Sequence, residues 1–261
     1  MNKQNLQKLI MFVCDLSEMK GNEWMREKLE EKFAKKAANF NGATQLEEIY
    51  EFCLQKIVKE HADKFYDNFP LLAIKDKLIE DFVRMEKFRR EDNFEDFCLA
   101  VYQQVESIVN TIINDVAFVQ KIKEYSSLPA LIKYDEQTQS HIRKGNLSIG
   151  KLVFLTKEDD KIVENMNKPA HNWYFNHKLR AVLYFVYFNG ELKGNIDLFD
   201  RVYSIGNYLY QGRNLNHRGG VTTQYQQEVI DDLLPNQHKY YFKFMGFLED
   251  FVSRINQNIK N

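Results

Sequence analysis

Apolar residues recur at steps of three and four over residues 94–112, and this repeat constrains the fold more than any other feature of the sequence. Such spacing places the apolar side chains along one face of a long α-helix. The pattern predicts that Phe97, Val101, Val105 and Ile108 are buried. The polar residues predicted on the opposite face are Gln103, Gln104, Glu106, Ser107, Asn110 and Thr111.

The same periodicity predicts helices along most of the rest of the chain. The further helical segments are expected at about residues 3–19, 23–38, 44–66, 71–90, 176–189 and 197–210. A last helix follows Pro235, and its predicted buried stripe consists of Tyr240, Phe244, Phe247, Leu248, Phe251 and Ile255. Four prolines and eleven glycines also leave few turns for an all-β fold. The sequence therefore predicts an all-α protein built as a multi-helix bundle.

Two short signals help to place helix starts. Asp92 or Asn93 is expected to cap the helix at residues 94–113, because both side chains can accept a hydrogen bond from a free backbone N–H group. Residues 147–155, "LSIGKLVFL", fit either a short strand or a buried helical turn. Helix is favoured there, because Ser148 can serve as a cap and no partner strand is evident.

Composition and charge exclude several classes of protein. The net charge is −1, so any site for a polyanion must be local and cannot arise from a basic field over the whole molecule. Cys14, Cys53 and Cys98 lie far apart in apolar settings, which predicts buried free thiols in a reducing cytoplasm. No run of eighteen apolar residues is present, so no membrane span is expected. Residues 1–20 predict an amphipathic helix and not a signal peptide, which also favours a cytoplasmic location.

Common catalytic motifs are missing from the sequence. It contains no GxxxxGK[ST], no GxGxxG between a strand and a helix, and no HExxH. His171 and His177 are six residues apart, and no carboxylate converges on them, so a metal pair is not favoured. Trp173 and Tyr174 beside them can stack on a base, although ordinary packing is the favoured explanation. No metal and no cofactor are expected.

Residues 212–220, "GRNLNHRGG", form the segment best suited to chemistry. If residues 213–217 are helical, Arg213 and His217 face the same way, because they are four positions apart. Arginine binds phosphate oxygens through parallel hydrogen bonds, and histidine exchanges protons near neutral pH. This pair can cleave RNA without a metal. The plainer alternative is a helix end with basic residues near the C-terminus and glycines that terminate it.

The segment "RNLNH" at 213–217 resembles the Arg–His signature of HEPN domains (higher eukaryotes and prokaryotes nucleotide-binding). The helix "FCLAVYQQVESIVN" at 97–110 also resembles the long helix against which that family packs its motif. The spacing is one residue short of the family's usual pattern, since three residues separate Arg213 from His217. The resemblance covers residues 90–258 and rests on these two segments.

The resemblance implies a HEPN-like bundle in the C-terminal two-thirds of the chain. It also implies a metal-independent endoribonuclease in bacterial phage defence or a toxin–antitoxin system. Arg213 and His217 would be catalytic and would act in a composite site of a homodimer. The residues expected to support them are Asn214, Asn216, Arg218, Glu106 and Asn110.

The sequence leaves one alternative open for the domain organisation and two for the function. Residues 1–89 are expected to form an N-terminal helical region and residues 90–261 the HEPN-like bundle, with one continuous domain as the alternative. The expected partners are RNA or a nucleotide, a second copy of the chain and a protein encoded in the same operon, with no membrane. The first alternative function is a catalytically inactive HEPN-like module for nucleotide sensing or protein interaction. The second is an unrelated helical scaffold in which the Arg–His pair is incidental.

Overall fold

The structure is a computed structural model of the 261-residue chain. It describes residues 8, 11–13, 15–16, 19–25, 27–28, 31, 42–130, 147–190, 196–213, 215 and 223–259, with the backbone alone at 42–47 and 196. The chain divides into two compact units, Met1–His61 and Ala62–Asn261, and each is described by itself.

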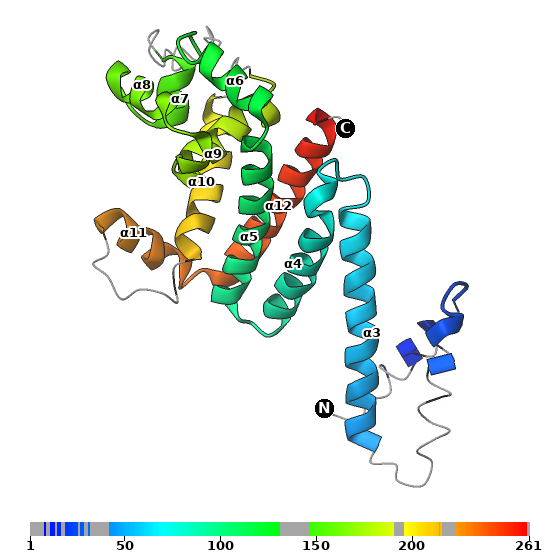
Figure 1. Cartoon of the computed structure of the whole chain (residues 1–261). Helices are drawn as coiled ribbons and strands as arrows, with labels where there is room; N and C mark the ends of the chain where they lie inside the picture. Colours follow the sequence, from blue (N-terminus) through cyan, green and yellow to red (C-terminus); the bar gives the residue numbers. More distant parts are fainter. Residues whose placement is uncertain are drawn as a thin grey trace, which may run out of the picture. The chain divides into compact units, whose positions relative to one another are not determined.

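Nearly all of the described chain is helical, and the prediction of an all-α, multi-helix bundle is confirmed. The elements are α3 (Gly42–Phe65), α4 (Leu72–Arg90), α5 (Phe94–Ile113), α6 (Val116–Tyr125), α7 (Ile149–Phe154), α8 (Asp159–Asn167), η1 (Ala170–Asn172), α9 (Phe175–Val182), η2 (Leu183–Tyr187), α10 (Ile196–Gly212), α11 (Gln224–Leu233) and α12 (Gln237–Asn258) (Figure 1). Within the described residues, the only β pairing is a single antiparallel bridge between Pro129 and Ser148.

The N-terminal unit contains a small apolar cluster. The described residues at 8–16 and 23–31 are helical, as predicted. Met19, at the end of the first predicted helix, lies in a bend, and the remaining residues of the two segments are outside the described residues. Gly21 turns the chain between them with φ at 95°, a backbone conformation that glycine adopts without strain. Met25, Ile49 and Cys53 are the buried residues of this cluster, and Cys53 is a buried free thiol as expected.

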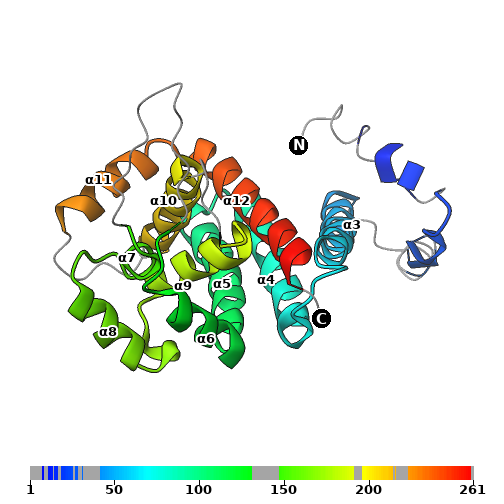
Figure 2. The same ribbon diagram turned by 90° about the horizontal axis from the view of Figure 1, so that it is seen from above.

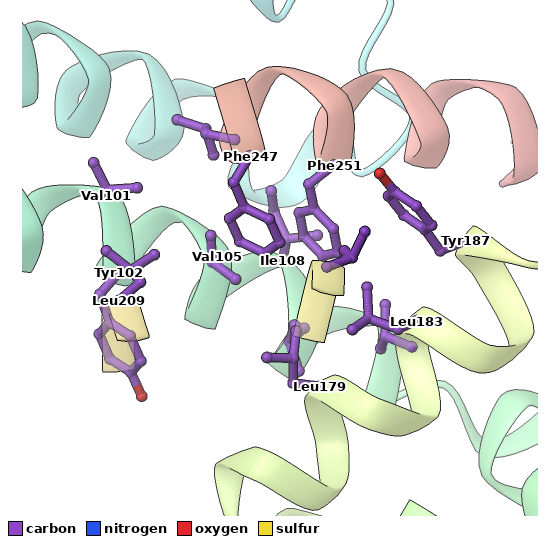
Figure 3. Packing of buried hydrophobic residues seen from close by; sticks show 14 of the residues in the cluster. Val101, Tyr102, Val105, Ile108, Leu179, Leu183, Tyr187, Leu209, Phe247 and Phe251 are labelled. Carbon is purple, nitrogen blue, oxygen red and sulfur yellow. The ribbon is translucent and has the colours of Figure 1, made fainter. Parts of the chain in front are cut away.

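The second unit is organised around α5. Figure 2 shows α5 in the middle of this unit, with α4, α12, α10 and α9 around it. Phe97, Val101, Val105 and Ile108 are all buried, so the predicted inner face of α5 is confirmed. Asn93 caps the helix by accepting a hydrogen bond from the Asp96 amide at 3.2 Å. The whole predicted stripe of α12 is buried as well. Figure 3 shows how side chains of α5, α9, α10 and α12 meet in one core.

Residues 62–89 belong to the unit that contains α5. From the sequence they are predicted to belong to the N-terminal helical region, residues 1–89. In the structure, α4 packs along α5, and Phe82 and Met85 are fully buried in the core that they share with Val101. Amphipathicity of α4 showed that it has an apolar face, but it did not show which helix would cover that face.

Gln104 departs from the sequence prediction, which placed it on the polar face of α5. It is fully buried. Its Oε1 accepts a hydrogen bond from Tyr66 Oη at 2.8 Å, and its Nε2 donates to the Ala100 carbonyl at 3.1 Å. Burial is tolerated because the amide has partners at both ends.

The segment predicted as one buried helix at residues 176–189 is α9 followed by the wider, π-helical turn η2. Every residue of η2 is buried.

Residues 149–154 form the helix α7, so helix was the correct alternative for the segment at 147–155. Ser148 caps α7 by accepting a hydrogen bond from the Lys151 amide at 3.2 Å. Buried Arg180 joins these elements, since its Nε donates to the Leu152 carbonyl and its guanidinium lies over the rings of Phe199 and Tyr203. Arg180 of α9 therefore contacts both α7 and the N-terminal half of α10.

Candidate functional site at the end of α10

The last turn of α10 lies close against α5. Gly212 ends the helix, and a Cβ atom added to it would lie 3.3 Å from Cys98 Sγ. A glycine therefore permits this close approach. Arg213 is the first residue beyond α10, although its amide still donates to the Leu209 carbonyl at 3.1 Å. The predicted helical face of Arg213 and His217 lies largely outside the described residues, because of residues 213–217 only Arg213 and Leu215 are described.

The Arg213 guanidinium lies in a corner formed by two tyrosine rings. Its central carbon is 4.2 Å from the ring centre of Tyr102 and 4.3 Å from that of Tyr210. The two ring centres are 5.9 Å apart with an interplanar angle of 61°. These distances describe a corner and not a parallel sandwich. Phe175 closes the aromatic cluster, because its ring centre is 4.9 Å from Tyr102 and 5.7 Å from Tyr210. Cation–π attraction to both rings stabilises the arginine in this position.

Glu106 supplies the negative charge of the site. Its Oε1 accepts a hydrogen bond from Tyr102 Oη at 2.7 Å and lies 3.7 Å from Arg213 Nη1. Burial, and the hydrogen bond to Glu106, raise the pKa of Tyr102, so the phenol remains protonated and continues to donate. The Arg213 side chain is 26% exposed, and its Nε is buried with no hydrogen-bond partner among the described residues.

A lysine from α9 extends the site one turn along α5. Lys178 Nζ donates to Asn110 Oδ1 at 3.0 Å and to the His171 carbonyl at 2.9 Å. Asn110 is four residues from Glu106, so the two side chains are neighbours on the surface of α5. Burial lowers the pKa of Lys178, and the nearby Glu106 carboxylate opposes that shift.

The structure brings together part of the site predicted from sequence. Arg213 forms an ion pair with Glu106, and Asn110, one turn further along α5, accepts a hydrogen bond from Lys178. Four predicted residues, Asn214, Asn216, His217 and Arg218, lie outside the described residues.

Three residues of the site were not predicted, namely Tyr102, Tyr210 and Lys178. Tyr102 was counted only as a member of the apolar stripe. Its hydroxyl lies four residues before Glu106, a helical spacing that could have indicated the hydrogen bond. Tyr210 lies three residues before Arg213, a spacing that could have indicated their contact. Lys178 carried no comparable local signal, since Asn110 is sixty-eight residues away.

In residues 171–177, the segment that contains His171 and His177, the side chains of Trp173 and His177 pack against neighbouring residues. Trp173 is buried, and its Nε1 donates to the Asn165 carbonyl at 2.8 Å, so its ring is not available to stack on a base. His177 packs edge-on against Phe154 and Tyr174. Burial, together with the charges of Arg180 and Lys168, lowers the pKa of His177. Among the described residues, no three His, Cys, Asp or Glu side chains gather as metal ligands would.

A scan against protein-family models and searches of curated proteins and solved structures found no match to this chain. The described part of the chain contains no helix with both the length and the apolar character of a membrane span.

Proposed function

We propose that this chain is a metal-independent endoribonuclease of HEPN type that acts in bacterial phage defence or a toxin–antitoxin system. One observation carries the proposal. Arg213, the arginine of the "RNLNH" segment, is packed against the rings of Tyr102 and Tyr210, with the Glu106 carboxylate 3.7 Å away. A catalytic arginine needs such preorganisation, because a guanidinium that is already in place needs no reorganisation as charge develops on the phosphate.

The proposed reaction is transesterification within the RNA strand. The ribose 2′-OH loses its proton and attacks the adjacent phosphorus, and the bond from phosphorus to the 5′-oxygen breaks. His217 transfers the proton, and the leaving oxygen gains one. Arg213 offsets the charge that accumulates on the phosphate oxygens. The products carry a 2′,3′-cyclic phosphate and a 5′-OH.

The proposal includes a symmetric homodimer. One chain supplies one Arg213 and one His217, and the family resemblance assigns the active site to two copies across a two-fold axis. Arg213 and Arg218 from both chains would then place four guanidiniums in one cleft. Such a cleft would provide the local positive field that a chain with a net charge of −1 lacks as a whole.

A catalytically inactive HEPN-like module is the second candidate, and one observation favours it. The charge of Arg213 already has a carboxylate and two aromatic rings as partners within a single chain. An arginine with these partners can serve packing alone. The two candidates differ in whether RNA is cut, and a binding assay alone does not separate them.

The deciding experiment incubates the purified protein with total RNA in the presence of EDTA. His217→Ala should lose roughly 10²- to 10⁴-fold in cleavage rate and should bind RNA almost normally. Arg213→Ala should lose both binding and cleavage, and Asn214→Ala should have a milder effect. His238→Ala and Arg201→Ala are matched controls, because both side chains are exposed on helices of the same unit. If the wild type leaves RNA intact, also when its operon neighbours are present, the inactive module replaces the enzyme.

A further inference from the structure

Lys178 lacks a direct anionic partner in the described part of the chain. Its ammonium donates to an amide oxygen of Asn110 and to the backbone carbonyl of His171, and both acceptors are neutral. No ion pair joins it to a carboxylate of the described residues. An ammonium group has three donors, so one remains after these two hydrogen bonds. A partly buried charge held only by neutral groups is costly unless an anion offsets it.

The charges around Lys178 do not balance. Glu106 acts on the ammonium of Lys178 and also forms the ion pair with Arg213. The cluster of Arg213, Lys178 and Glu106 therefore contains two cations and one carboxylate and carries a net charge of +1. This local excess lies in a chain whose overall charge is −1. A phosphate group has the charge and the acceptor oxygens that this cluster lacks.

We propose that Lys178 is a second phosphate-binding cation of the Arg213 site and holds a backbone phosphodiester of the RNA next to the one bound by Arg213. Asn110 and the His171 carbonyl position the ammonium, and its remaining donor binds the phosphate. The inference rests on the proposed function, since it names a further contact for the same RNA. Lys178 orients the strand and takes no part in the proton transfer.

A purely structural role for Lys178 makes a different prediction. As a bridge between α5 and η1, the lysine would affect stability and leave the salt dependence of binding unchanged. A phosphate contact is different because it releases counterions, which steepens the fall of log affinity with log salt by about 0.7 in slope per contact on a single strand. The salt slope therefore separates the two roles.

The test measures binding of a short 2′-O-methyl RNA oligonucleotide to the full chain at several salt concentrations. This probe lacks the attacking hydroxyl and cannot be cut by the proposed reaction. Lys178→Gln should weaken binding by about fivefold near 0.1 M salt and should reduce the slope by about 0.7. Lys178→Arg should retain the slope, because it keeps the charge. Lys75→Gln is the matched control, since Lys75 is also partly buried and also donates to a backbone carbonyl, that of Asp67, at 2.6 Å.

Thermal unfolding of each variant verifies that it is folded. Asn110→Ala provides a second test of whether Lys178 contacts the phosphate. Without Asn110 the ammonium loses one positioning partner, so binding should weaken and Lys178→Gln should add less in the double variant. An unchanged affinity and slope in folded Lys178→Gln would overturn the inference. An equal effect of Lys75→Gln would also overturn it, because it would show that any lysine contributes.

Failure of this inference and failure of the proposed function are distinguishable. If unmodified RNA is cut while Lys178→Gln binds the probe normally, the proposed ribonuclease function is retained and the phosphate contact of Lys178 is rejected. If the probe binds with the expected dependence on Lys178 while RNA stays intact, the phosphate site stands and the enzyme is rejected. Absence of any binding rejects both.

Discussion

Glu106 Oε1 lies 3.7 Å from Arg213 Nη1, where α5 meets the end of α10. This separation is an ion pair but exceeds the range of a direct N–H···O hydrogen bond. The carboxylate is held instead by the Tyr102 hydroxyl at 2.7 Å. Arg213 therefore has an anionic neighbour to which it is not tightly bonded. A phosphate that accepts two hydrogen bonds from the guanidinium can compete with the Glu106 carboxylate.

Glu106→Gln should strengthen binding of the 2′-O-methyl oligonucleotide by about two- to fivefold, because it removes the anion that competes for Arg213. Equilibrium titration at fixed salt measures this change. Glu124→Gln is the control, since Glu124 is exposed on α6 of the same unit. Weaker binding in Glu106→Gln would show that the carboxylate positions the arginine and does not compete with RNA.

The active enzyme should be a symmetric dimer. Sedimentation should detect the dimer at micromolar concentrations, and cleavage per chain should fall when dilution dissociates it, because each chain supplies half of the site. A protein that sediments as a monomer at high concentration and still cuts RNA contradicts this mechanism.

Truncation of the inner face of α5 should be costly. Phe97→Ala or Ile108→Ala should lower the free energy of unfolding by about 2–5 kcal/mol, because both side chains are fully buried and leave a cavity. Urea denaturation gives this value. Leu72→Ala should cost less than about 0.5 kcal/mol, since Leu72 is exposed. Losses below that level at both Phe97 and Ile108 would mean that the inner face of α5 is wrongly assigned.

The buried hydrogen bond from Tyr66 to Gln104 should give a measurable coupling free energy in a double-mutant cycle. Tyr66→Phe should destabilise the protein by about 1–3 kcal/mol, because it leaves the buried Gln104 Oε1 without its donor. Gln104→Met in the same chain should recover part of this loss by removing the unpaired acceptor. Urea denaturation of the two single variants and the double variant completes the cycle, and strict additivity would show that the two residues are not coupled.

His177 should make the fold sensitive to mild acid. Its pKa is lowered in the folded state, chiefly by burial, so the unfolded chain binds the proton more strongly. Stability should therefore be greatest above the unfolded pKa of about 6.5 and should decline as the pH falls from there toward the lowered folded pKa. His177→Gln should reduce the difference in unfolding free energy between pH 7.5 and pH 5.5, and His171→Gln, at an exposed position, should retain it. An undiminished difference in His177→Gln would assign the acid sensitivity to other groups.

The sequence by itself determined the helices and several of their ends. Three- and four-residue spacing identified the buried faces of α5 and α12, and Asn93 and Ser148 provided local caps. These features depend on residues within a turn or two of one another, so the local pattern contains them in full. The sequence also singled out Arg213, Glu106 and Asn110, although it could not show how they meet.

Only the tertiary structure decided how these helices pair and which polar groups meet. Gln104 was expected on the polar face of α5 and is buried, because Tyr66, thirty-eight residues away, supplies its partner. Lys178 reaches Asn110 across a separation of sixty-eight residues. Periodicity fixes the backbone of each helix, but the side chain that covers a given face depends on how the chain returns to it. The corner that holds Arg213 exists only where α5, α9 and α10 pack together.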